Sequence, residues 1–265
     1  MSDETVEFID GESATDAEVD FEYSPSLHAL RPLAEYLDEY HRLSQGHDVR
    51  ALLKKGQPLL IYIHGGYWQR LSAADSLFNA PDALRHGVSL HAVEYTLAPQ
   101  ARIPQIIEEC IADVLSVMRE MQPSHVVLAG CSAGAHLAAM CARDERIGKE
   151  LNGAALLSGV YDVRPIVRTP TNDPLFLTAE SAAEVSPQLL TPVFVPQALL
   201  AVGKHEPSEF IRQNNEYAEL LASTGADVQV EVVEHRDHFN LPYDLLREDT
   251  KVGQWVLKAL GKVSV

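Results

Sequence analysis

The chain has little positive charge, few cysteines and no long hydrophobic run. Its 265 residues carry 21 Lys and Arg against 38 Asp and Glu, which gives a formal net charge of −17. A protein this acidic repels phosphate backbones and anionic lipids, so we expect neither a nucleic acid nor a membrane surface as a partner. The three cysteines are too few and too scattered for a disulfide framework or a zinc cluster, and they favour free thiols in a reducing compartment.

The start of the sequence lacks the features of a secretory signal. Met1 is followed by Asp3 and Glu4 rather than by basic residues and an apolar run. No stretch of the sequence approaches the ~20 apolar residues of a membrane span. We therefore expect a cytoplasmic protein.

Acidic residues are concentrated in a leader. Residues 1–22 hold nine of them and no Lys or Arg, so the remainder, with 29 acidic and 21 basic residues, carries a charge of −8. The leader has few apolar residues to bury, and we interpret it as an acidic arm that is either mobile or strapped over the body. Residues 23–265 are predicted to form a single domain.

Short apolar runs alternate with helical patterns along this domain. The runs expected to be strands cover residues 59–63, 88–93, 125–129, 153–157, 197–202 and 228–233. Apolar residues recur at helical spacing over residues 26–42, 103–121, 132–143, 208–223 and 241–260. Near-continuous apolar strands suit a parallel sheet that is buried on both faces. The order of elements therefore predicts an α/β fold, with a mostly parallel central sheet and helices on both faces.

One proline-rich stretch interrupts this alternation. Residues 161–196 contain six prolines, and only short helical pieces fit between them. An insertion of this length is usually a lid or a pocket wall over the carboxyl edge of the sheet. We therefore expect residues 161–196 to form a proline-rich lid.

The most informative motif is Gly130-Cys131-Ser132-Ala133-Gly134, which lies between an expected strand and an expected helix. In that context the pattern G-x-S-x-G is typical of a nucleophile elbow. The turn is so tight that its flanking positions need small side chains, and it places the Ser132 hydroxyl at the N-terminus of the helix. We therefore expect Ser132 to be a nucleophile. Cys131 is interpreted as a small buried residue, and His136 as a support of the elbow through a hydrogen bond.

A second motif, His64-Gly65-Gly66, follows an earlier expected strand. Two glycines allow backbone N–H groups to approach a substrate oxygen without an intervening Cβ. In folds with the elbow, one oxyanion donor is the N–H after the nucleophile, here Ala133, and another comes from such a loop. Gly65, Gly66 and Ala133 are therefore predicted to form the oxyanion hole.

A nucleophilic serine requires a base, and the base requires an orienting acid. The chain order of the fold is nucleophile, acid and then histidine. His235 and His238 both follow the last expected strand, and we favour His238 because it lies in the loop before the next helix. Glu206 is the first carboxylate after the strand at residues 197–202, with Glu209 as the alternative. The spacing of His235 and His238 could suit a metal, but no third group of ligands accompanies them, so we expect no metal.

These motifs resemble one family, the kynurenine formamidases (arylformamidases) of the α/β-hydrolase fold. The likeness covers roughly residues 23–239, and the Tyr67-Trp68 pair after the two glycines is more specific than the elbow. The stretches that carry it are Tyr23–Ser26, His64–Gln69, Gly130–Met140, Leu157–Asp162, Pro165–Val167, Ser208–Phe210 and Asp237–Phe239.

The resemblance implies an activity and a set of site residues. The family hydrolyses the N-formyl group of N-formylkynurenine to formate and a free arylamine, with a Ser/Asp/His triad and without metal or cofactor. By position, the nucleophile is Ser132, the acid position falls on Glu206 and the base on His238. This sequence departs from the family in having glutamate as the acid and a shortened segment before residue 59.

We therefore predict a metal-free serine hydrolase that cleaves an aryl formamide and needs no cofactor. Its partner is a small-molecule substrate, and Tyr67 and Trp68 are expected to pack on the aromatic leaving group. A homodimer is compatible with the sequence. The alternative enzyme is a carboxylesterase for short acyl chains, and the alternative from another class is a non-catalytic binding protein with the same fold.

Overall fold

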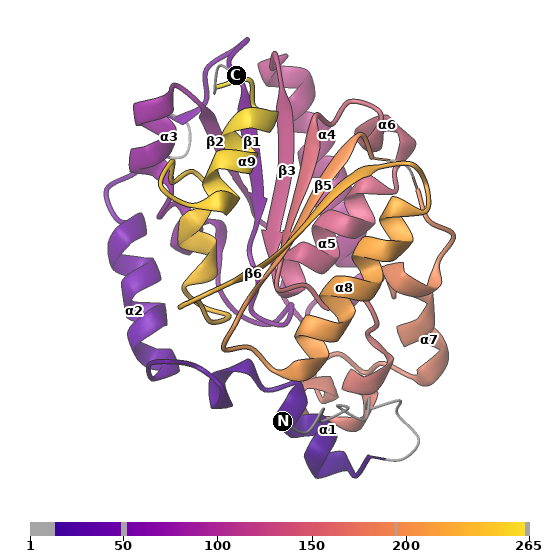
Figure 1. Cartoon of the computed structure of the whole chain (residues 1–265). Coiled ribbons are helices and arrows are strands. Elements are labelled where there is room, and N and C mark those ends of the chain that lie inside the picture. The colour runs from indigo at the N-terminus through magenta and orange to yellow at the C-terminus, as the bar shows by residue number, and fades with distance from the viewer. Residues whose placement is uncertain (1–13, 49–51, 194, 263–265) are drawn as a thin grey trace, which may run out of the picture.

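The computed structural model describes residues 14–48, 52–193 and 195–262. Residues 1–13 of the predicted acidic arm lie outside these ranges. Within them, six parallel strands form one sheet in the order β2-β1-β3-β4-β5-β6 (Figure 1). The strands are β1 (Leu59–Ile63), β2 (Ser89–Val93), β3 (Val126–Cys131), β4 (Gly153–Leu157), β5 (Gln197–Gly203) and β6 (Asp227–Val233). The prediction of six strands in a parallel sheet is confirmed.

Helices cover both faces of the sheet, as predicted (Figure 1). One face packs against α4 (Ile103–Met121), α5 (Ala133–Ala142) and α8 (Ser208–Ala222), and the short α6 (Glu145–Gly148) lies beside α4 and α5. The other face packs against α3 (Ala80–His86) and α9 (Lys251–Ala259). Alternate residues of β1 face the two cores, because successive side chains of a strand point to opposite faces. Leu59 and Ile61 therefore lie in one core, and Leu60 and Tyr62 in the other.

Two predicted helices are shorter than their apolar patterns. The pattern over residues 26–42 divides into η1 (Pro25–Leu27) and α2 (Leu33–Ser44), because Pro32 immediately precedes α2. The pattern over residues 241–260 divides into η7 (Leu241–Asp244) and α9. Thr250 caps α9 by accepting a hydrogen bond from the Gly253 amide, so this helix starts ten residues later than expected.

The described residues of the insertion at 161–196 contain short helical pieces, as its prolines predicted. They are η4 (Arg164–Arg168), η5 (Pro170–Asn172), α7 (Ala179–Glu184) and η6 (Pro187–Leu189). Another short turn, η3 (Ala73–Ser76), lies against α2.

The last part of the acidic leader is folded onto the body. Residues Asp16–Glu22 form α1, which begins with a capping box between Thr15 and Glu18. Val19 and Tyr23 are buried in the same core as α4 and α5, and α1 lies against η4 and α8. The start of the domain therefore adjoins the carboxyl end of the sheet.

None of the helices among the described residues is long and apolar enough to cross a membrane. The three cysteines, Cys110, Cys131 and Cys141, are buried free thiols, and the predicted burial of Cys131 is confirmed.

Candidate active site

Ser132 lies in a sharp turn between β3 and α5. Its backbone has φ 58° and ψ −125°, a strained conformation for a residue with a side chain. The Ser132 amide donates to the Leu157 carbonyl at 2.9 Å, and the Ser132 carbonyl accepts from the first turn of α5. An added Cβ on Gly130 would lie 2.2 Å from the Gly134 carbonyl oxygen, and one on Gly134 would lie 2.0 Å from that of Ile63. Both glycines are therefore required by the close approach of the backbone.

Glu206 and His238 are joined by a hydrogen bond. Glu206 Oε2 lies 2.8 Å from His238 Nδ1, and both side chains are buried. The second carboxylate oxygen, Oε1, accepts from the Ser158 hydroxyl at 2.6 Å and from the Gly203 amide at 2.7 Å. The structure thus brings together the two residues predicted as acid and base. His238 and Ser132 line the same cavity.

The alternative histidine lies elsewhere. His235 is exposed, at φ 61°, in the turn directly after β6. His238 follows three residues later in the buried loop. Among the described residues, no group of three or more His, Cys, Asp or Glu could hold a metal ion. The absence of a metal from the reaction stays a prediction.

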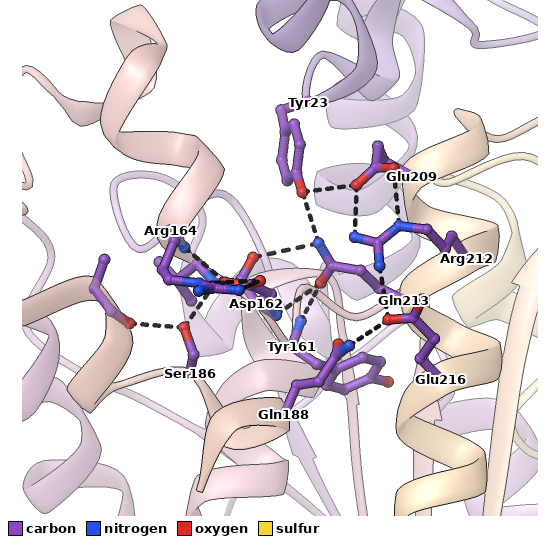
Figure 2. Close-up of polar contacts among 12 residues, drawn as sticks. Tyr23, Tyr161, Asp162, Arg164, Ser186, Gln188, Glu209, Arg212, Gln213 and Glu216 are labelled. Atoms are coloured by element: carbon purple, nitrogen blue, oxygen red, sulfur yellow. Dashed lines mark hydrogen bonds and ion pairs between the residues drawn. The ribbon is translucent and has the colours of Figure 1, made fainter. Parts of the chain in front are cut away.

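The alternative acid, Glu209, is engaged in a separate polar network (Figure 2). Its carboxylate accepts two hydrogen bonds from the Arg212 guanidinium, at 2.9 and 2.8 Å. It also accepts from the Tyr23 hydroxyl at 3.1 Å, and that hydroxyl accepts in turn from Gln213 at 2.7 Å. Figure 2 shows these side chains converging from the start of α8 and from Tyr23, just after the leader. Glu209 therefore joins the N-terminal segment to α8 rather than contacting His238.

The same network reaches the segment after β4. Gln213 Oε1 accepts from the backbone amides of Tyr161 and Asp162 at 2.7 and 2.8 Å (Figure 2). Asp162 is paired in turn with Arg164. One buried glutamine of α8 thus connects Tyr23, α8 and the start of the proline-rich insertion.

Two supporting residues had no assigned role at the level of the sequence. Ser158, wholly buried directly after β4 at φ 50°, donates to Glu206. Asp237 fixes the histidine loop through its carboxylate, which accepts from the Leu30 amide at 2.8 Å and the Tyr36 hydroxyl at 2.6 Å. The signal available in the sequence was a polar side chain beside a predicted feature: Ser158 directly follows an expected strand, and Asp237 directly precedes His238. The partners could not be inferred because they lie far away in the sequence.

The glycine loop lies beside the elbow. An added Cβ on Gly65 would lie 2.8 Å from the Cys131 carbonyl oxygen and 3.1 Å from Ser132 Cβ. Gly66 has φ +93°, and its added Cβ would lie 2.4 Å from the Arg70 carbonyl oxygen. Both glycines line the cavity with Ser132, whereas Ala133 is buried as the first residue of α5. Within the described part of the chain, the amides of Gly65, Gly66 and Ala133 have no recorded hydrogen-bond acceptor.

The structure separates Tyr67 from Trp68. Tyr67 lines the cavity and donates its hydroxyl to the Tyr23 carbonyl at 2.7 Å, and burial raises the pKa of this hydroxyl. Trp68 is wholly buried, packs edge-to-face on His136 at 5.1 Å and does not line the cavity. The prediction that Trp68 contacts substrate is therefore wrong. The two residues stand at φ 52° and 60°, and this turn directs the indole into the core beside α5.

His136 has a different partner from the one expected. Its Nε2 donates to the Val185 carbonyl at 2.7 Å, so its side chain connects α5 to the proline-rich insertion rather than to the elbow. Burial lowers its pKa to about 4. The pKa of His64, buried and stacked on Tyr95 at 4.2 Å between ring centroids, is lowered to about 4 for the same reason.

These two buried histidines predict acid sensitivity. Because the pKa of each is lower in the folded state than its ordinary 6.5, their contribution to stability is complete above pH 6.5 and is lost as the pH falls towards 4. A difference of this size corresponds to about 3 kcal/mol per histidine. We expect His136→Gln to reduce the fall in unfolding free energy over this range, as measured by urea titration. His235→Gln is the matched control, because His235 is exposed. An equal pH dependence of the unfolding free energy in the wild type and both variants would contradict the prediction.

The cavity in front of Ser132 has a volume of about 230 Å³. Much of its wall comes from the N-terminal segment, through residues 23–26 and three residues of α2: Leu33, Leu37 and Tyr40. The insertion at residues 161–196 contributes Thr171. The expected lid therefore supplies less of the wall than predicted, because the bonds of Asp237 and Glu209 draw the N-terminal segment across the site.

Comparison with known proteins identifies the fold and the family of this chain. A profile of the alpha/beta hydrolase fold matches residues 60–241. A kynurenine formamidase of Salmo salar is 38% identical over 218 residues, which cover 77% of this chain and 74% of the relative. The chain belongs to the kynurenine formamidase family. Another kynurenine formamidase, from Danio rerio, is 37% identical over 240 residues, 86% of this chain and 78% of that protein.

The structural likeness extends beyond kynurenine formamidases. A crystal structure from Silicibacter sp., assigned as a thioesterase, has a TM-score of 0.79 and covers 90% of this chain and 98% of its own. At 23% sequence identity it shows the shared fold. The resemblance to this family inferred from the motifs is confirmed, and the protein is a hydrolase of the α/β-hydrolase fold.

Proposed function

We propose that this protein is a metal-free serine hydrolase that removes the formyl group from an aryl formamide such as N-formylkynurenine. The observation that carries the proposal is the bond between Glu206 and His238 at the cavity that Ser132 lines. Its membership of the kynurenine formamidase family supports the choice of a formamide.

The proposed triad consists of Ser132, His238 and Glu206. Glu206 engages Nδ1 of His238, which leaves Nε2 to act as the base towards Ser132. Ser132 Oγ attacks the formyl carbon as His238 accepts its proton. The developing oxyanion is stabilised by the amides of Gly65, Gly66 and Ala133, and in other enzymes each strong donor of this kind contributes about 3–4 kcal/mol.

The tetrahedral intermediate then breaks down into an acyl-enzyme and an arylamine. The C–N bond breaks, His238 returns the proton to the departing arylamine, and the formyl group stays on Ser132 as an ester. A water molecule, deprotonated by His238, attacks this ester. The bond to Ser132 Oγ then breaks, His238 returns the proton to this oxygen, and formate is released. Tyr67, as a residue of the cavity wall, is proposed to pack on the aromatic ring of the leaving group.

The substrate class is tested by comparing the hydrolysis of substrates that differ in the size of their acyl group. A formyl carbon carries only hydrogen, and Gly65 lies close to the elbow, so we expect little room for a larger acyl group. For an aryl formamide and the matching aryl acetamide, kcat/KM should differ by about a hundredfold in favour of the formamide. Rapid turnover of p-nitrophenyl acetate without release of formate from aryl formamides would instead identify a short-acyl carboxylesterase. Hydrolysis of neither class would identify a non-catalytic binding protein.

A further inference from the structure

The charge of the cavity differs from the charge of the chain. The protein carries 38 acidic residues against 21 basic ones. Nineteen of the described residues line the cavity of Ser132, and none of these nineteen is Asp or Glu. Arg70 is the one Lys or Arg among them. The wall of this cavity therefore contains no Asp or Glu, although the protein is acidic, and Arg70 is its one permanently charged residue.

Among the residues that the structure describes, Arg70 also differs from most arginines in lacking an internal counter-charge. Within the described residues, its exposed side chain has no recorded ion pair or hydrogen bond. Most other arginines are paired with a carboxylate: Arg31, Arg42, Arg85, Arg146, Arg164, Arg168, Arg212, Arg236 and Arg247. The guanidinium of Arg70 is thus available to a ligand.

The backbone holds Arg70 at a fixed place relative to the elbow. The Arg70 amide donates to the Gly66 carbonyl at 3.1 Å, and the Gln69 amide donates to the same oxygen at 3.0 Å. Gln69 is anchored in turn by its side-chain bond to the Thr171 carbonyl. Arg70 therefore lies one turn of backbone after the glycine proposed to bind the oxyanion.

We propose that Arg70 binds a carboxylate on the leaving-amine half of the substrate and makes the enzyme selective for aryl formamides that carry a carboxylate. This inference rests on the proposed function, in which the formyl half carries only hydrogen, so any charged group of the substrate belongs to the amine half. A guanidinium binds a carboxylate through two parallel hydrogen bonds. A local positive charge also offsets the repulsion that a chain of charge −17 exerts on an anionic substrate.

The test compares charged and neutral substrates in matched variants. The neutral substrate is formanilide. The charged substrates, which all carry a carboxylate, are the three isomeric formamidobenzoates and N-formylkynurenine, whose carboxylate is accompanied by an ammonium group. The measured quantity is the preference, which is kcat/KM for the best charged substrate divided by that for formanilide. The variants are Arg70→Gln, Arg70→Lys and, as a control that changes the net charge equally, Arg119→Gln. Arg119 is exposed on α4 and does not line the cavity.

We expect Arg70→Gln to lower the preference by about tenfold, mainly through a higher KM for the charged substrate, because a hydrogen-bonded charge is lost from binding. Arg70→Lys should keep part of the preference, since it retains the charge but not the two parallel bonds. Arg119→Gln should keep the wild-type value. An unchanged preference in Arg70→Gln, or an equal loss in Arg119→Gln, would overturn the proposal.

A binding measurement separates this inference from the proposed function. If formanilide is hydrolysed and the preference does not depend on Arg70, the inference fails while the function stands. If no aryl formamide is hydrolysed, the function fails, and calorimetry with the isomeric aminobenzoates and aniline tests Arg70 directly. Arg70→Gln should then weaken the binding of an aminobenzoate by about tenfold relative to aniline. Equal binding of aminobenzoate to both proteins, or no binding to either, would overturn the inference.

Discussion

Replacing Ser132 with alanine should lower kcat for an aryl formamide by about a million-fold, the size typical for loss of a triad serine. Without the Ser132 hydroxyl no acyl ester can form, and the remaining oxyanion donors can only assist direct attack by water. The protein should remain folded, because alanine fits the space of serine and the turn is held by its backbone bonds and by Gly130 and Gly134.

The check combines formate release with thermal unfolding. A melting temperature close to that of the wild type, together with loss of turnover, is the expected pair of results. Residual activity above about a thousandth of the wild-type rate in a folded variant would remove Ser132 from the mechanism, since loss of the nucleophile typically costs far more.

Replacing Glu206 with glutamine should lower kcat by about ten-thousandfold while substrate binding is largely kept. Glu206 Oε1 accepts from two donors, the Ser158 hydroxyl and the Gly203 amide, so a glutamine would place its oxygen there. Its NH₂ group would then face His238 Nδ1 as a donor. That contact favours the tautomer with the proton on Nε2, which cannot accept a proton from Ser132.

Two further variants complete this test. One distinguishes the length of the acidic side chain from its charge, and the other is a control. Glu206→Asp keeps the charge but shortens the side chain by one methylene, so its kcat should lie between those of the wild type and Glu206→Gln. Glu209→Gln is the matched control on the neighbouring helix. It should lower the melting temperature, because it weakens the buried pair with Arg212, and it should change kcat by much less than Glu206→Gln does. Normal turnover by Glu206→Gln with an inactive but folded Glu209→Gln would show that the acid is misassigned.

The sheet and the elbow could be predicted because their signals are local. Each strand is a short apolar run that is buried between two layers of helices, and such a run is visible without knowledge of its neighbours. The elbow is specified by five consecutive residues, and its two glycines are explained by backbone approaches within this turn and against Ile63.

The pocket wall could not be predicted because it depends on distant partners. Tyr36 bonds to Asp237 across 201 residues of sequence, and Tyr23 bonds to Glu209 across 186. These contacts place the N-terminal segment over the site, whereas the proline-rich insertion alone suggested a lid. Trp68 was misplaced for a related reason. Its neighbour Tyr67 faces the cavity, but the positive φ of both residues, which the sequence does not reveal, sends the indole into the core.

The most direct test of the account is to label the nucleophile while a substrate competes for it. A serine-directed phosphonate is added to the intact enzyme with and without excess N-formylkynurenine, and the modified residue is mapped by peptide mass spectrometry. We predict modification of Ser132 alone, at a rate that falls as the concentration of the formamide rises. Modification of another residue, or labelling of Ser132 at a rate that does not depend on the formamide, would contradict the claim that Ser132 is the nucleophile of a formamide hydrolase.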